Sequence, residues 1–157
     1  MNIPSIGQCL EILKNNNTPS NVIEHSKAVA KVAEEIADNL IKKGIKLDKK
    51  LVVASALLHD IERHKEDHVV VGAELLKKLG FPEIAKVMKY HAYHEMQKDN
   101  KFSLSIEQKI VFYADKRVRN DKEVSLDERY DDLEKRYKAD LSEEIKFVKK
   151  MEEELLG

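Results

Sequence analysis

The most apolar stretch of the chain is LVVASALLHDI, residues 51–61. Its apolar side chains lie on every side of a helix rather than on one face, which is typical of a central, buried helix. His59 and Asp60 come directly after three apolar residues at positions 56–58, where burial is expected to be deepest. A buried carboxylate without a partner is strongly destabilising. The stretch therefore predicts both the centre of a helical fold and a polar site at the end of that helix.

Helical periodicity continues on both sides of this stretch. Apolar residues recur every three or four positions between residues 21 and 43, which predicts an amphipathic helix that ends at Gly44. Asp48, Asp67 and Ser125 are expected to cap the helices that follow them. The other helices are expected at residues 6–14, 68–79, 83–95, 106–119, 125–137 and 142–156. Because no alternating stretch exceeds four residues, the sequence predicts an all-α fold of seven or eight helices.

The composition is that of an ordinary globular protein. The chain has 157 residues, a formal net charge of −1, 42% hydrophobic residues and 36% charged residues. This length suits one domain over residues 1–157, and without a basic excess nucleic acid is not expected as a partner. The single Cys9 allows neither a disulfide nor a cysteine zinc site within the chain. Because no signal peptide and no apolar run near the ~18 residues of a membrane span are found, we expect a cytoplasmic protein without membrane contact. The sequence leaves the oligomeric state open.

Two more polar residues interrupt the apolar faces of predicted helices. His25 lies in the apolar stripe of its helix, and Asp115 lies on the same face as Val111. Taken alone, each has an ordinary explanation, since an inward histidine commonly bonds a backbone carbonyl and an inward carboxylate commonly pairs with a cation. Such cations follow Asp60 and Asp115 in the sequence: Arg63, Lys65, Lys116 and Arg119. Taken together, two inward carboxylates beside two inward histidines favour a shared divalent metal ion, which keeps the carboxylates ionised and the imidazoles neutral.

The order of these residues resembles that of a known family. His25, His59–Asp60 and Asp115 on successive helices resemble the HD superfamily of metal-dependent phosphohydrolases, in particular its small, stand-alone members. Residues 56–61 are close to the most recognisable segment of that family, and the resemblance extends from about Val22 to Asp115. It implies a helical HD domain whose core lies at about residues 20–120, with a helical extension at about residues 125–157. It also implies that a divalent metal ion binds to His25, His59, Asp60 and Asp115.

Two further segments resemble the HD proteins that bind a second metal ion. Residues 67–76 resemble their His-x-x-x-Gly-Ala-Glu segment, and residues 89–95 resemble the segment that supplies additional histidines. The resemblance implies a second ion that shares Asp60 and binds His68 and His91. His94 is a further candidate ligand, because residues three positions apart can lie on one helix face. Histidine and carboxylate ligands suit Fe, Mn, Ni, Co or Zn, so we expect one or two such divalent ions.

The chain departs from the family at two places. Glu62 replaces a common glycine and is expected to add a carboxylate near the site. The Gly-Tyr-Pro signature of cyclic-dinucleotide phosphodiesterases is absent after His94, so a cyclic dinucleotide is not expected as the substrate. The resemblance therefore implies a metal-dependent hydrolase whose substrate is the phosphate ester of a nucleotide or of another small molecule.

In this interpretation, Asp60 fixes the metal ions and takes a proton from the attacking water. Lys116, together with Arg117, balances charge on the phosphoryl group, although Lys116 is equally well explained as a surface cation. His94 or His91, whichever is not a ligand, protonates the leaving oxygen. Two other functions fit the same residues: a di-iron oxygenase, and a metal-stabilised binding or regulatory module that does no chemistry.

Overall fold

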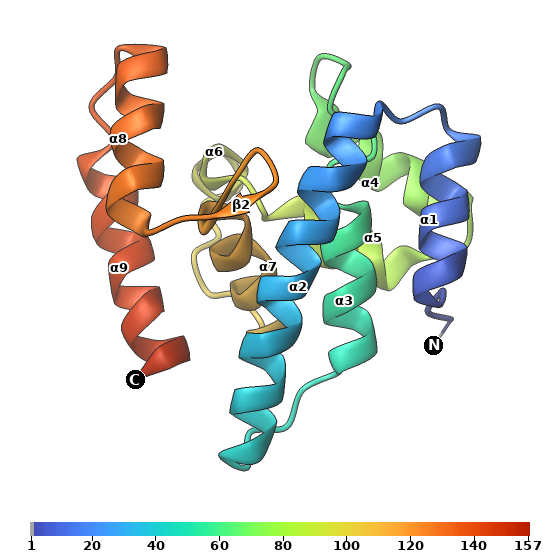
Figure 1. Ribbon diagram of the computed structural model, residues 1–157, viewed down its shortest axis with the longest axis horizontal. Helices are drawn as coiled ribbons and strands as arrows, with labels where there is room; N and C mark the ends of the chain where they lie inside the picture. The colour runs from blue at the N-terminus through green and yellow to red at the C-terminus, as the bar shows by residue number, and fades with distance from the viewer. Residues whose placement is uncertain (1) are drawn as a thin grey trace.

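A computed structural model describes residues 2–157 as nine helices and one two-stranded hairpin (Figure 1). In chain order the elements are α1 (Ile6–Asn15), α2 (Ser20–Lys42), α3 (Lys49–Leu58), α4 (His68–Lys78), α5 (Pro82–Lys89), α6 (Tyr93–Lys98), α7 (Ile106–Lys116), β1 (Val118–Arg119), β2 (Lys122–Glu123), α8 (Leu126–Tyr137) and α9 (Ser142–Leu156). The predicted all-α fold is confirmed. Among residues 2–157, no helix combines the length and the apolar composition that a membrane crossing requires.

Helix α3 is the centre of the fold, as the sequence predicts. Every residue from Leu51 to Leu58 is buried, and α3 packs against α1, α2, α5 and α7. Asp48 caps the helix, because its side chain accepts a hydrogen bond of 3.0 Å from the backbone N–H of Leu51. The helix ends at Leu58, so that His59 and Asp60 lie in the turn that follows it rather than in its last turn.

The helix predicted at residues 83–95 is divided into α5 and α6, which raises the number of helices to nine. Ala92 has an extended backbone (φ −115°, ψ 129°) that ends the helical path. At the same place the Nδ1–H of His91 donates to the carbonyl of Met88, at 2.8 Å. This bond takes a carbonyl at the helix end that a continuing helix would have used for its own backbone. A side-chain contact therefore ends α5 where periodicity alone predicts continuation.

The helix predicted at residues 106–119 is also shorter, because α7 ends at Lys116 and a hairpin follows. Val118 pairs with Glu123, and Arg119 pairs with Lys122. The turn between the strands begins at Asn120, whose φ of 58° is a left-handed value that asparagine tolerates better than most residues. The hairpin packs against α2, so it carries the chain from α7 back to the element that holds His25.

Of the other two predicted caps, the one at Ser125 is formed and the one at Asp67 is not. Ser125 accepts a hydrogen bond of 3.1 Å from the backbone N–H of Glu128 and so begins α8. Asp67 precedes α4, but its backbone is left-handed (φ 50°) and its side chain makes no capping bond. The turn before α4 therefore depends on backbone geometry at Asp67 and not on the expected carboxylate cap.

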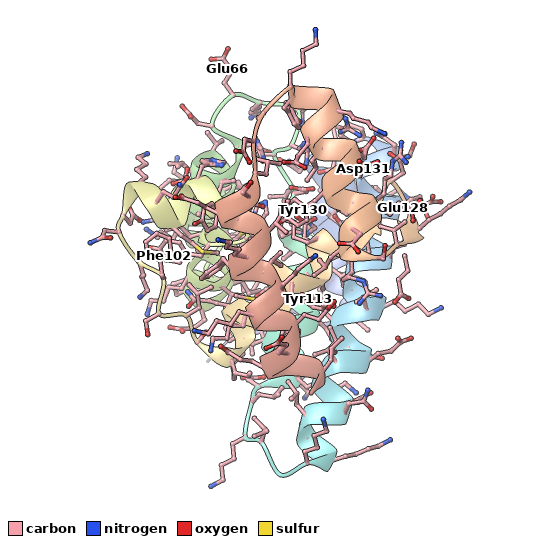
Figure 2. The ribbon with its side chains drawn as sticks, turned by 90° about the vertical axis from the view of Figure 1, so that its left-hand side faces the viewer. Glu66, Phe102, Tyr113, Glu128, Tyr130 and Asp131 are labelled. Carbon is pink, nitrogen blue, oxygen red and sulfur yellow. The ribbon has the colours of Figure 1, made fainter. Side chains whose placement is uncertain are left out.

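Helices α8 and α9 form a pair that lies to one side of the other helices (Figure 1). Figure 2 shows Tyr130 between the two helices, and its hydroxyl donates a hydrogen bond to Glu144 of α9. Four aromatic rings attach α9 to the rest of the fold, with centroids 5.4 to 6.0 Å apart: Tyr93, Phe102, Phe112 and Phe147. The hydroxyl of Tyr113 in α7 also donates to Glu152 of α9. The pair is thus part of the packed structure and is placed to cover the ends of α6 and α7.

Candidate metal centre

The four residues predicted to hold one metal ion come together in space. His25 comes from α2, His59 and Asp60 from the turn after α3, and Asp115 from α7, and one ligand atom of each lies within 4.8 Å of the others. The Nε2 atom of His59 is 3.3 Å from an oxygen of Asp60 and 3.2 Å from an oxygen of Asp115. Ligand atoms about 2.1 Å from a common ion are separated by roughly 3.0 to 3.4 Å. The spacing therefore fits one shared cation.

Backbone carbonyls fix the orientation of three of the imidazoles. The Nδ1–H group of His25 donates to Asn120, at 2.6 Å, and that of His59 donates to Ala56, at 2.6 Å. His91 makes the same kind of bond, as described above. Because a carbonyl can only accept, each Nδ1 must carry its hydrogen, and each Nε2 is left for a metal ion or for a second proton. Such bonds hold a ligating histidine in the required tautomer.

The two carboxylates of this group are ionised at neutral pH. Burial favours their neutral form, but His59 and His91 hold the pKa of Asp60 well below its usual range. Burial also favours the neutral form of Asp115. The charge of Lys116 and the hydrogen bonds with His25 and His59 outweigh this effect, so the pKa of Asp115 is also well below its usual range. Two negative charges thus lie in a buried site, which is the electrostatic condition for binding a cation.

A second group of possible ligands shares Asp60 with the first. One ligand atom each of Asp60, His68 and His91 lies within 4.8 Å of the others. The Oδ1 atom of Asp60 is buried, has no hydrogen-bond partner among residues 2–157, and is 3.5 Å from Nε2 of His91. Buried polar atoms are nearly always paired. Burial also lowers the pKa of His68 and so favours its neutral form, which is the form a metal ligand needs. The free oxygen therefore fits the position of a second cation.

The structure does not bring His94 into either ligand group. Because α5 ends at Lys89, His91 lies in the turn before α6 while His94 lies in α6, and the expectation that they share one helix face is wrong. The side chain of His94 is 68% exposed, and its Nε2 is 3.5 Å from the carboxylate of Glu95. It does line the larger cavity beside the two groups. His94 is therefore placed at the rim, where it can meet a bound molecule.

Lys116 and Arg117 follow Asp115 but lie in different environments. The Nζ atom of Lys116 is 3.3 Å from an oxygen of Asp115, and its side chain is only 12% exposed, so it is not a surface cation. The guanidinium of Arg117 donates to the hydroxyl of Tyr113, at 2.7 Å, and to the carbonyl of Val124. Lys116 thus lies beside the candidate site, whereas the guanidinium of Arg117 braces the hairpin.

Glu62 is buried but belongs to neither ligand group. Its carboxylate accepts a hydrogen bond from Asn16, at the end of α1, and pairs with Lys65. Asn16 and Thr18 also donate to the carbonyl of Ile61, at 3.3 and 3.2 Å. The carboxylate expected near the site is thus turned toward α1, where it fastens the turn that carries His59 and Asp60.

Replacing this carboxylate is expected to lower stability without changing metal content. Glu62→Gln should lower the free energy of unfolding by about 1–3 kcal/mol at pH 7, because a buried charge-assisted hydrogen bond is lost. Burial raises the pKa of Glu62, but the bonds from Lys65 and Asn16 outweigh it and lower the pKa below 4.5. The stabilising contribution is therefore present above pH 4.5 and is lost as the pH falls through the lower folded value. Urea unfolding of the wild type and of Glu62→Gln, at pH 7 and at a pH below the folded pKa of Glu62, measures the difference in stability. Glu66→Gln is the exposed control. Loss of metal from Glu62→Gln would contradict this role.

Two cavities open beside the ligand groups. The larger, of about 650 Å³, is lined by His68, His91 and Lys116 and extends between α8 and α9. The smaller, of about 470 Å³, is lined by His25 and Asp60 together with residues of the hairpin and α8. Four arginines that sequence reasoning did not place at the site line one or both cavities: Arg63, Arg119, Arg129 and Arg136. The sequence could have grouped Arg129 with Arg136, because residues seven positions apart lie on one face of a helix.

Comparison with known proteins places these residues in one family segment. A family model described as HD domain matches residues 22–120, a span that contains both ligand groups and ends before α8. The chain is 37% identical to an uncharacterized protein of Methanocaldococcus jannaschii, over 82% of this chain and 84% of that protein. No solved structure matches the chain.

Two relatives with named activities match only part of their own length. A tRNA (cytidine(56)-2′-O)-methyltransferase of Picrophilus torridus is 36% identical, over 98% of this chain and 47% of that protein. A dihydroneopterin 2′,3′-cyclic phosphate phosphodiesterase of M. jannaschii is 33% identical, over 60% of this chain and 44% of that protein. The chain therefore spans about half the length of these two relatives.

Proposed function

The chain belongs to the HD domain family, and on that premise we propose that it is a metal-dependent phosphohydrolase that cleaves the phosphate ester of a nucleotide or of another small molecule. The observation that carries the proposal is the pair of ligand groups joined by Asp60, in which both carboxylates are ionised and one buried oxygen has no partner in the described structure. Without a cation at this place, the buried Oδ1 atom of Asp60 would lack a partner, which is uncommon for a buried polar atom.

Each residue of the site has a proposed task. His25, His59, Asp60 and Asp115 would hold one divalent ion, and Asp60, His68 and His91 would hold a second. When bound, these ions would supply an activated water and neutralise phosphate charge. Asp60 takes a proton from the attacking water. Lys116, held beside Asp115 and largely shielded from solvent, balances charge on the phosphoryl oxygens. His94 lines the larger cavity at its rim and protonates the leaving oxygen.

The substrate proposed first is a 2′,3′-cyclic phosphodiester of a small molecule. The name of the M. jannaschii phosphodiesterase describes such a substrate for that protein, and its match supports the same chemistry here. The larger cavity, at about 650 Å³, has the size of an ordinary small-molecule site. The match to the methyltransferase carries no reaction over to this chain, because the family segment of this chain is the HD domain and the chain corresponds to 47% of that protein.

The proposal is tested by hydrolysis assays on purified protein of known metal content. Adenosine 2′,3′-cyclic phosphate and a panel of nucleoside monophosphates are incubated with the protein and with added Mn, Ni, Co, Fe or Zn. We expect one of these metals to stimulate release of the monoester or of phosphate, a chelator to abolish the release, and the metal to restore it. Hydrolysis that the chelator does not affect would refute the metal site as its origin.

Two other outcomes would replace the proposal. Iron-dependent oxygen consumption with a visible absorption band would support the di-iron oxygenase, since the same ligands suit iron. No turnover on any phosphate ester, together with tight binding of one of them, would support a metal-stabilised binding module.

A further inference from the structure

The smaller cavity gathers most of the guanidinium groups of the protein. Four of the five arginines line it, next to His25 and Asp60: Arg63, Arg119, Arg129 and Arg136. They come from three places in the fold, which are the turn after α3, the hairpin, and α8. The acidic residues that line the same cavity are Glu24, Asp60 and Asp121. Arginine is the side chain best suited to phosphate, because its planar group forms two parallel hydrogen bonds with it.

Three of these arginines have acidic partners in the structure. Arg63 is 3.4 Å from an oxygen of Asp60. Arg119 and Arg136 both pair with Asp132, at 3.0 and 2.7 Å, so that one carboxylate serves two guanidinium groups. These pairs account for Arg63, Arg119 and Arg136 and leave Arg129 without an acidic partner.

Arg129 differs from the others, because its side chain forms no ion pair and no hydrogen bond with any of residues 2–157. Its Nε–H is buried and lacks an acceptor, and the same is true of the Nε–H of Arg119. Neither of the remaining acids compensates, since Glu24 pairs with Lys27 instead and Asp121 forms no ion pair in the described chain. Buried N–H groups without acceptors are uncommon in folded proteins. Among the arginines that line this cavity, the guanidinium group of Arg129 is therefore left without an acidic partner, which favours an anionic ligand there.

We propose that the smaller cavity is an anion subsite that binds a second phosphate group of the substrate, with Arg129 as the residue that contacts it. The inference rests on the proposed function, because it assigns the reacting phosphate to the ligand groups around Asp60. Arg129 lines both cavities, so it lies where a molecule that occupies both would pass. The proposed substrate thus carries two phosphate groups rather than one.

The subsite also gives the C-terminal helices a role in choosing the substrate. Arg129 and Arg136 lie on α8, beyond residues 22–120 that match the HD family. The two phosphates can come from one small molecule, such as a nucleoside with a 5′-phosphate and a 2′,3′-cyclic phosphate, or from the last two phosphates of a nucleotide chain. Both sources present the same chemistry to the arginines, and the experiment separates them.

The first test measures binding and does not require turnover. Metal-loaded protein is titrated in a calorimeter with adenosine 3′-monophosphate and with adenosine 3′,5′-bisphosphate. We expect the bisphosphate to bind at least about tenfold more tightly, the effect of one charge-assisted hydrogen bond. Arg129→Gln should abolish this preference and leave the affinity for the monophosphate unchanged. Arg129→Lys should keep part of the preference, because the charge remains while the paired donors are lost.

Lys135→Gln is the matched control. Lys135 lies on the same helix, carries the same charge, is 76% exposed and pairs with Asp131, which is also exposed. It should keep the full preference for the bisphosphate. Thermal unfolding of each variant verifies that it is folded. If Arg129→Gln does not fold, Arg129→Lys is used to measure the change in preference for the bisphosphate. Equal affinities of the wild type for both ligands, or an equal loss of both in Arg129→Gln, would overturn the subsite.

The second test uses turnover and separates the two sources of the anion. KM is measured for adenosine 2′,3′-cyclic phosphate, for its 5′-phosphorylated form, and for a dinucleotide that ends in the cyclic phosphate. Arg129→Gln should raise KM for the last two and not for the first. A lower KM for the dinucleotide than for the 5′-phosphorylated nucleoside assigns the second phosphate to a chain, and the reverse order assigns it to a small molecule. A preference for the bisphosphate without any turnover would refute the proposed function and support the subsite. Turnover without that preference would support the proposed function and refute the subsite.

Discussion

Asp60→Ala is expected to remove the bound metal and the activity together. Asp60 contributes to both ligand groups, so its loss takes one ligand from each. Loss of a residue that only orients a ligand already lowers metal affinity about 10- to 100-fold. Loss of a ligand shared by two ions should therefore lower it by more than about 100-fold, and hydrolysis should fall to the level of chelated protein. Elemental analysis of freshly purified protein measures the metal, and the assay with cyclic phosphate measures the activity.

The control for this substitution is Glu66→Ala. Glu66 is an exposed carboxylate in the same turn region, and it points away from the body of the molecule in Figure 2. Its removal changes the net charge by the same amount and should leave metal and activity unchanged. Equal metal content in the wild type and in Asp60→Ala would remove the basis of the site assignment and of the function proposed from it.

Phe112→Ala is expected to produce the largest loss of stability. Phe112 is fully buried in α7, and its ring packs against Phe147 of α9, with centroids 5.9 Å apart. Truncation of a buried phenylalanine costs about 3–5 kcal/mol, because the apolar contacts are lost and a cavity remains. This is a large share of the roughly 5–15 kcal/mol that stabilises a typical domain. Urea unfolding should show a lower midpoint with an unchanged slope.

Phe102→Ala provides the comparison within the same aromatic cluster. Phe102 loses the same atoms on truncation, but it is 41% exposed and lies at the edge of the molecule in Figure 2, so its removal should cost only about 1 kcal/mol. If Phe112→Ala does not fold, Phe112→Leu keeps most of the volume and should cost about 1 kcal/mol. Equal losses for the two alanine variants would contradict the buried position of Phe112 and its part in attaching α9.

The attachment of α9 matters for the site as well as for stability. Phe112 lies three residues before Asp115 on α7, and the Nζ atom of Lys116 is 5.5 Å from the centre of its ring. The helix that presents a candidate ligand to the metal site therefore also holds α9, and with it the residues that close the larger cavity. Packing of the C-terminal helices and the shape of the substrate site are thus linked through one helix.

The candidate ligands were predictable because they break a local rule. A helix buried on all sides should contain apolar residues, so His59 and Asp60 at the end of α3 stand out in the sequence alone. His25 and Asp115 stand out in the same way on their own helices. That these residues bind metal ions is a proposal. Burial periodicity acts over a few neighbouring residues, so the chain alone shows that these side chains face inward, whereas their meeting in space depends on how the helices pack.

The sequence by itself determined the all-α fold, the central position of α3 and the set of inward polar residues, since each depends on helical periodicity within one element. Only the tertiary structure decided the break before His91, the hairpin after α7 and the direction of Glu62. It also decided that arginines from three elements meet in one cavity. Contacts such as the bond from Asn16 to Glu62 join residues 46 positions apart. No local pattern records which distant partner a side chain meets, because that choice is made by how whole helices pack.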